Sequence, residues 1–426
     1  MKQQKFFAGS LLAFAAILVS CSNTTEEIID PTPQPEPEPE VNVIDLSENG
    51  MANCYIVTEP GLYRFKADNQ FNLGKDLPIP PEINPVNADL VWQTNKGSIE
   101  SIALDGETWS APYIVFEVKE ASGNAVISAL DETGVIVWSW HIWMPQEEIE
   151  GVKLNSGYEV MNMNLGALNN TPGDPASYGM LYQWGRKDPF PAAATLTGDT
   201  STLSAPMYDK DGNEVKILNS SWTDTNSNTI EYAIANPTVC LSNYSQFNIS
   251  HDWLRADLSD ISLWGNPEGE ERNSQDLYLN KGEKTCYDPS PLGWRVAPVD
   301  TFRDFTSTGG YAWEYEDFNV ADINEDGIID MNDYNYGWYF KTADGGELYF
   351  PAAARFDGSY AMLMGSMSGL WGNYWSNTPY MNMNGGAYCA LAFQVKDQAG
   401  NEMVTISASA GSSRADAFSI RCIRDN

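Results

Sequence analysis

The sequence predicts a multidomain protein in which an all-β sandwich at residues 45–150 precedes a larger α+β domain at residues 151–426. Three observations support this prediction. Short runs of β-branched and aromatic residues, separated by Gly, Pro, Asn and Asp, fill the first stretch without a long helical period. From Gly151 onward the pattern changes to scattered aromatic and glycine motifs. The chain of 426 residues is also long enough for two or three domains.

The first 20 residues have the features of a signal peptide. Lys2 and Lys5 precede an apolar stretch, Phe6–Val19, that is too short for a permanent membrane span. The following Leu18-Val-Ser-Cys21 resembles a bacterial lipobox, in which the signal is cleaved before the cysteine. We therefore expect residues 1–20 to be removed and Cys21 to carry the lipid of an outer-membrane lipoprotein. An ordinary secretory signal is the alternative.

Residues 21–44 read as a tether between the lipidated cysteine and the folded part. Prolines alternate with Thr, Gln and Glu from Pro31 to Pro39, which favours an extended polyproline II chain with no apolar face. At about 3.1 Å per residue this segment spans some tens of Å. Glu26 and Glu27 resemble the surface-export signal of Bacteroidota lipoproteins. We expect a surface-exposed rather than a periplasm-facing protein.

The composition excludes some partners and limits the cysteine chemistry. There are 58 acidic and 24 basic residues, a formal net charge of −34, which argues against nucleic acid and against binding to anionic lipid by charge. Five cysteines remain besides Cys21, so at least one has no partner within the chain. No Cys-x-x-Cys pair is present, which disfavours zinc binding and thiol redox chemistry.

Six strands are expected in residues 45–150. The last of them carries Trp138 and Trp140 on one face and Trp143 on the other, which suggests either a carbohydrate platform or, more simply, core. The region resembles the β-sandwich modules of Bacteroidota surface lipoproteins and fimbrillin-like proteins. The expected strands contain 54–57, 61–65, 89–92, 113–118, 124–129 and 134–143.

An ordered set of motifs characterises the larger domain. It comprises 158–167, 178–190, Gly293-Trp-Arg-Val296, 349–353, 372–377 and 419–424. In this order the set resembles the Fibrobacter succinogenes major paralogous domain. The resemblance implies a fold of the C-type-lectin-like and formylglycine-generating-enzyme class. It also implies a helix at Thr301–Thr308, for which Asp300 is a possible cap.

Residues 191–285 are expected to be an insertion into this domain. A hairpin turn is expected in it at Asp209–Asn213. Cys422 lies in the last motif, and we expect it to form a structural disulfide with Cys286 or Cys389. A free buried cysteine is the alternative for each of these residues.

Residues 322–333 have the spacing of a calcium-binding loop. Calcium prefers six or more oxygen ligands, and Gly327 stands where such a loop turns sharply. Apolar Ile329 stands where the loop needs a packed anchor. Aspartate at the last position resembles dockerin loops, but only one loop is present, so cohesin binding does not follow. The expected Ca²⁺ ligands are Asp322, Asn324, Asp326, the Ile328 carbonyl, Asp330 and Asp333. A solvated acidic turn is the alternative.

A ligand site is expected at Trp371, Tyr374, Trp375 and Asn377, because flat aromatic rings stack on sugars and amides bind hydroxyls. A buried turn of the fold is the alternative. Catalytic motifs are scarce, and the two histidines, His141 and His251, fall in different expected domains. The sequence therefore predicts a non-catalytic surface protein that binds glycan or protein and contains structural calcium. A fimbrial subunit is the second possibility and an enzyme the third.

Overall fold

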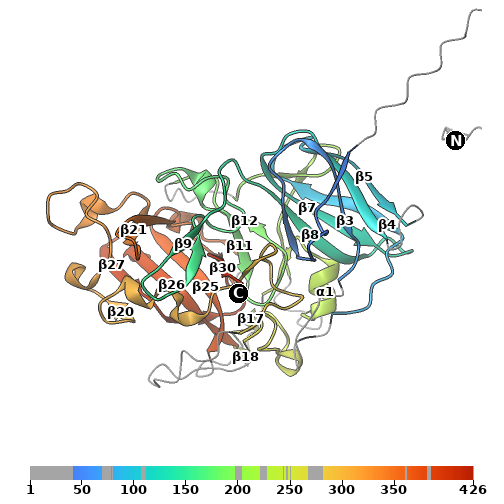
Figure 1. Ribbon diagram of the computed structural model, residues 1–426. Coiled ribbons are helices and arrows are strands. Elements are labelled where there is room, and N and C mark those ends of the chain that lie inside the picture. The colour runs from blue at the N-terminus through green and yellow to red at the C-terminus, as the bar shows by residue number, and fades with distance from the viewer. Residues whose placement is uncertain are drawn as a thin grey trace, which may run out of the picture. The chain divides into compact units, whose positions relative to one another are not determined.

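Two β-sheets face each other in the N-terminal part of the chain, as Figure 1 shows in blue and cyan. Phe65 on one sheet packs against Trp140 on the other with ring centroids 5.0 Å apart. The first sheet has the order β1 (Val43–Asp45), β3 (Gly61–Lys66), β6 (Tyr113–Val118) and β5 (Ile99–Asp105). The second has the order β14 (Glu214–Val215), β13 (Met207–Tyr208), β4 (Asn87–Gln93), β7 (Gly123–Leu130), β8 (Ile136–Met144) and β2 (Cys54–Ile56).

The structure is a computed structural model. It describes residues 42–69, 78, 80–106, 112–196, 204–220, 228–242, 244–245, 248–249, 251–266, 282–359, 362–380 and 385–425. The predicted signal peptide, Cys21 and nearly all of the tether lie outside the described residues. Within the described part, no helix is long and apolar enough to cross a membrane.

Part of the predicted insertion extends the second sheet. Strands β13 and β14 form a hairpin whose turn is Asp209–Asn213, so the turn predicted there is confirmed. The Asp209 carboxylate accepts hydrogen bonds from the backbone N–H groups of Asp211 and Asn213, which is why the sequence turns at this point. Strand β13 then pairs with β4 through Tyr208 and Gln93.

Further sheets make up the larger half. One has the order β19 (Trp294–Arg295), β30 (Ile423–Arg424), β10 (Glu159–Met161) and β9 (Gly151–Lys153). The ten-stranded sheet has the path β12 (Phe190–Pro191), β11 (Met180–Gln183), β29 (Ala417–Ser419), β25 (Trp371–Tyr380), β26 (Gly386–Lys396), β27 (Glu402–Ser407) and β20 (Tyr311–Ala312). Off this path are β23 (Phe356–Asp357), β24 (Met362–Leu363) and β28 (Ala410–Ser413).

Three two-stranded pairs complete the described strands. They are β15 (Leu218–Asn219) with β16 (Val239–Cys240), β17 (Tyr244–Ser245) with β18 (Asn248–Ile249), and β21 (Gly337–Lys341) with β22 (Glu347–Pro351).

Helices are few and short, so the chain is β-rich and the larger half departs from the predicted α+β composition. Among the described residues the α-helix is α1 (Ile230–Ala235). The 3-10 helices are η1 (Pro175–Ser177), η3 (Ala256–Leu258), η4 (Val299–Phe305), η5 (Tyr315–Asp317), η6 (Met331–Asp333) and η7 (Gly365–Met367).

The helix predicted at Thr301–Thr308 is instead the 3-10 segment η4, which is kinked at Phe302. Pro298 stands at the N-cap of η4, so Asp300 lies inside the segment and not before it. Its carboxylate is occupied elsewhere, since it accepts a hydrogen bond of 2.9 Å from the Tyr158 hydroxyl.

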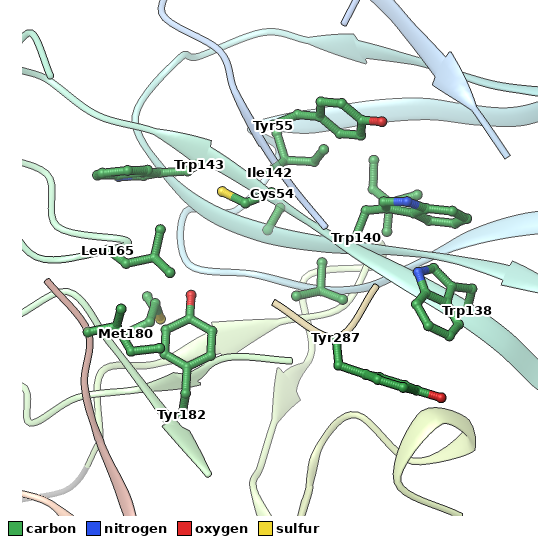
Figure 2. Packing of buried hydrophobic residues seen from close by; sticks show 14 of the residues in the cluster. Cys54, Tyr55, Trp138, Trp140, Ile142, Trp143, Leu165, Met180, Tyr182 and Tyr287 are labelled. Carbon is green, nitrogen blue, oxygen red and sulfur yellow. The ribbon is translucent and has the colours of Figure 1, made fainter. Parts of the chain in front are cut away.

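A single core connects the two expected domains. Strand β8 is buried on both faces, because the residues facing away from the first sheet pack against the larger half. Figure 2 shows Trp143 and Ile142 in one cluster with Leu165 and Tyr182. The Trp143 Nε1–H donates to the Ala167 carbonyl at 2.7 Å. The tryptophans of β8 are therefore core, and Asn42–Asn426 forms one compact unit.

Buried polar groups also join the two parts. Asn53 donates through Nδ2 to the carbonyls of Cys286 and Asp288, at 2.6 and 2.9 Å. On β8, the Ser139 hydroxyl donates to Asp188, and the Lys187 ammonium pairs with the same carboxylate at 2.8 Å. These side chains are almost fully buried, so their hydrogen bonds hold one relative placement of β8 and the larger half.

Candidate functional site

An open groove lies on one face of the ten-stranded sheet. Its cavity volume is about 200 Å³, below the range of about 300–1,000 Å³ that is typical of sites that enclose a drug-sized ligand. Polar and aromatic side chains dominate the lining, together with one charged residue, Arg355. The lining includes Tyr311, Trp371, Asn373, Gln394, Thr405 and Ser407.

The register of four strands brings these side chains together. Trp371 on β25 lies opposite Gln394 on β26, which in turn lies opposite Thr405 on β27. A second row runs from Asn373 through Ala392 and Ser407 to Tyr311 on β20. Because side chains alternate between the two faces of a strand, both rows point to the same face.

The opposite face of the same strands packs in the protein interior. Tyr374, Leu391, Phe393 and Ile406 belong to one buried cluster. Gly372 faces Phe393, and a Cβ at this glycine would lie 2.2 Å from the Phe393 ring. This division between a buried apolar face and an accessible polar face fixes the register of the strands.

Two carboxamides in the groove have unused hydrogen-bonding capacity. The side chains of Asn373 and Gln394 form no hydrogen bond with any described residue, and Asn373 Oδ1 is buried without a partner. Asn373 lies opposite Ala392, so Gln394 is its diagonal neighbour on the adjacent strand, about 7–8 Å away. The Gln394 carboxamide can offer both donors and an acceptor to a ligand, whereas the Asn373 oxygen is shielded from solvent.

Arg355 and Trp371 form one end of the groove. The guanidinium lies over the Trp371 ring at 5.3 Å from its centroid. Ala354, in the left-handed region with a φ of 61°, donates its N–H to the Trp371 carbonyl and so places Arg355 beside the indole. The Trp371 Nε1–H donates to the Lys396 carbonyl at 2.7 Å, which fixes the ring.

Two carboxylates partly offset the charge of Arg355. Its nitrogens lie 3.6 Å from Asp357 Oδ2 and 3.9 Å from Asp416 Oδ2, and Nε is buried without a partner. Burial raises the pKa of the Asp416 carboxyl, whereas Arg355 acts in the opposite direction. The arginine is therefore held by two long ion pairs and not by a close bidentate one.

Aromatic rings also border the other end of the groove. Tyr311 is 38% exposed and packs edge-on against Trp313, with ring centroids 4.8 Å apart. Trp313 is 58% exposed, the highest fraction among the described tryptophans. From β25 to β20 there are three interstrand spacings of about 4.8 Å, so the aromatic ends lie about 14 Å apart.

Of the four residues predicted for the ligand site, only Trp371 lines this groove. Tyr374 is buried and donates its hydroxyl to the Pro351 carbonyl. Trp375 is stacked on Phe418 at 4.2 Å and donates through Nε1 to the Tyr182 carbonyl. Asn377 is 1% exposed. These three positions belong to the core, where they cannot meet a ligand at the surface.

The sequence prediction missed Asn373, Gln394, Thr405 and Arg355. A signal for Gln394 and Thr405 was present, because polar residues at 392–396 and 405–407 alternate with apolar ones. Arg355 gave no local signal. It reaches the groove only through the turn at Ala354.

The predicted calcium loop has a backbone frame built by its own side chains. Asp322 Oδ2 accepts the N–H of Gly327 at 2.7 Å, and Gly327 has a φ of 83°, which favours glycine. Asp333 accepts the N–H groups of Ile323 and Asp330 through its two oxygens. Ile329 packs against the buried cluster of the larger half, as predicted for the anchor.

One oxygen of the loop has no partner, although the carboxylates are not gathered around one point. Asp322 Oδ1 is buried and accepts no hydrogen bond from the described residues. Ile328, whose carbonyl is a predicted ligand, has a side chain that is 62% exposed. In the part of the chain that the structure covers, no three His, Cys, Asp or Glu side chains form a group that could hold a metal.

The predicted disulfide of Cys422 is absent, because Cys286, Cys389 and Cys422 are all free thiols in the structure. Cys422 Sγ lies 3.2 Å from Ser290 Oγ, and Cys286 Sγ lies 3.5 Å from the Pro78 carbonyl. Burial raises the pKa of the Cys286 and Cys422 thiols to about 12, so neither is a ready nucleophile at neutral pH.

No protein-family model, curated protein or solved structure matches the chain. The interpretation of the groove and of residues 322–333 as binding sites therefore depends on the geometry described above.

Proposed function

We propose that this protein is a surface lipoprotein of the outer membrane that binds glycans without catalysis, and that the groove is its binding site. The groove supports this proposal most directly, because aromatic rings stand at both ends and free carboxamides lie between them. Flat rings stack on sugar C–H faces, while amides bind sugar hydroxyls. The lipidated Cys21, the tether and the resemblance to the major paralogous domain and its lectin-like class remain part of the proposal.

The scarcity of reactive side chains supports a non-catalytic role. His141 is completely buried, and burial lowers its pKa to about 3, so it is not placed to exchange protons with a substrate. The described cysteines are buried thiols. The groove is lined by amides, hydroxyls and aromatic rings rather than by a pair of carboxylates.

Replacing Trp371 with alanine is expected to weaken glycan binding by up to about tenfold, because a stacking ring is worth up to about 1.5 kcal/mol. A glycan and protein array identifies ligands of the wild-type chain, and calorimetry then gives the dissociation constants. Tyr208→Ala, on β13 outside the groove, is the control and should bind as the wild type does. Silence of the wild-type protein on both arrays would refute the binding function.

We further propose that residues 322–333 bind one structural Ca²⁺ through the six predicted ligands. The unpartnered Asp322 Oδ1, the turn at Gly327 and the packed Ile329 support this assignment. Since the carboxylates do not converge, binding requires them to rotate toward a common centre. Tyr334, directly after the loop, donates its hydroxyl to the Gly369 carbonyl at 2.9 Å, two residues before Trp371. The ion would stiffen a loop tied to the groove.

Calcium is expected to raise the melting temperature, and Asp326→Ala is expected to abolish that shift. A ligand at 100 times its dissociation constant stabilises the folded state by about 2.7 kcal/mol. Differential scanning fluorimetry in EDTA and in a series of Ca²⁺ concentrations measures the shift. Asp211→Ala removes an exposed aspartate from the hairpin turn and should leave the shift intact. Identical melting of the wild type with and without calcium would contradict the site.

A further inference from the structure

We propose that the groove selects an uncharged oligosaccharide over an acidic one of the same length and linkage. The inference rests on the proposed glycan-binding function and adds the chemical class of the ligand. It follows from two features of the groove, namely the pair of free carboxamides and the charge around Arg355.

The carboxamides of Asn373 and Gln394 are matched to hydroxyl groups. A sugar hydroxyl donates one hydrogen bond and accepts others, so it can satisfy both the carbonyl and the NH₂ of an amide. A carboxylate only accepts, and it would leave the amide oxygens without a donor. The buried Asn373 Oδ1 already lacks a donor within the described structure. Since this oxygen is shielded from solvent, the accessible amide groups of Gln394 are the ones that gain more from a hydroxyl than from a carboxylate.

The charges beside the groove disfavour a second anion. Arg355 is the one cation among the described residues that line it. Asp357 and Asp416 pair with Arg355 at 3.6 and 3.9 Å, so three ionised groups carry a net charge of −1. An acidic ligand would have to compete with these carboxylates for the guanidinium. It would also approach a protein whose formal net charge is −34.

The spacing of the aromatic ends indicates the size of the ligand. Trp371 and Tyr311 lie on strands separated by three spacings, or about 14 Å. One sugar ring does not cover this span. The groove therefore fits an oligosaccharide whose terminal rings contact Trp371 and Tyr311, with hydroxyls between them at Asn373 and Gln394.

The test compares matched neutral and acidic ligands on the full chain. Linear oligosaccharides of glucose, galactose and mannose, two to six sugars long, are titrated beside the same compounds after oxidation of their C6 hydroxyls to carboxylates. We expect the oxidised form to bind at least about tenfold more weakly. Equal or tighter binding of the oxidised form would overturn this inference and leave glycan binding standing. Binding of neither form would overturn both.

Two variants separate the carboxamide contribution from the charge contribution. Gln394→Leu approximately keeps the side-chain size, and it is expected to weaken binding of the neutral ligand about tenfold. Asp357→Asn removes one competing carboxylate, and it is expected to strengthen binding of the oxidised ligand several-fold with little change for the neutral one. Asp344→Asn, in the exposed turn between β21 and β22, is the matched control and should change neither. If the ratio of the dissociation constants of the oxidised and the neutral ligand is the same in Asp357→Asn as in the wild type, the role of charge is refuted.

Discussion

Replacing Arg421 with leucine is expected to lower the free energy of unfolding by about 3–5 kcal/mol, because several buried acceptors lose their donor. Arg421 is fully buried. Its guanidinium donates to Asn164 Oδ1 and to the carbonyls of Met161, Asn162 and Tyr349 at 2.7–3.2 Å. Arg421 thereby joins β10 and the segment directly after it to β22, a strand far away in the sequence.

Urea titration of the wild type and the variants measures this effect. Arg421→Lys keeps the charge but not the planar fork of donors, so an intermediate loss is expected. Burial lowers the pKa of Arg421 to about 10, and the group remains protonated at neutral pH. Arg255→Leu removes an ion pair with Asp257 on the solvent-exposed surface and should lower the stability far less. An equally small loss at Arg421 would show that its acceptors find other partners.

Acidification is expected to destabilise the protein through His141. This side chain is neutral in the folded state, with Nε2 at 2.8 Å from Asn124 Oδ1 and Nδ1 at 3.3 Å from the Tyr182 hydroxyl. Burial lowers its pKa from 6.5 to about 3. Between these values the unfolded chain binds more protons than the folded one, so stability falls as the pH falls. The loss is about 1.4 kcal/mol per pH unit, or about 3 kcal/mol between pH 6.5 and pH 4.

Comparison with His141→Gln separates the effect of His141 on the pH dependence of stability from the effect of the many carboxylates. Glutamine retains a donor for Asn124 but does not titrate. The difference in unfolding free energy between the wild type and the variant should therefore shrink as the pH falls from 6.5 to 4. Chemical denaturation at several pH values gives this difference. A difference that is constant with pH would mean that His141 is protonated in the folded state.

The sequence predicted much of the sandwich because alternation is a local signal. Strand β6 was predicted to the residue, at Tyr113–Val118. Strand β5 was missed, since a register shift between Glu100 and Ile102 interrupts its alternation. The three-residue strand β1 begins at Val43, inside the end of the predicted tether, and gave too short a signal.

The groove was harder to predict, because five separate segments form it. Alternation alone places Trp371, Asn373 and Trp375 on one face of β25. The register shift between Tyr374 and Trp375 ends this regularity, and Trp375 lies in the core. Which aromatic residue meets solvent depends on strands more than 30 residues away in the chain. The predicted domain boundary near residue 150 likewise carried no information about the buried contacts that cross it.

The core shared by β8 and the larger half has a mechanical consequence. Under the proposed function, a glycan held at Trp371 would pull on the last part of the chain, whereas the proposed lipid anchor at Cys21 would pull on its beginning. Tension between these two points would cross the Trp143–Ala167 hydrogen bond and the packing around it. Since many buried contacts must separate at once, the bond to the glycan is expected to rupture before the polypeptide extends. The protein would then transmit shear from the surface to the membrane as a stiff link.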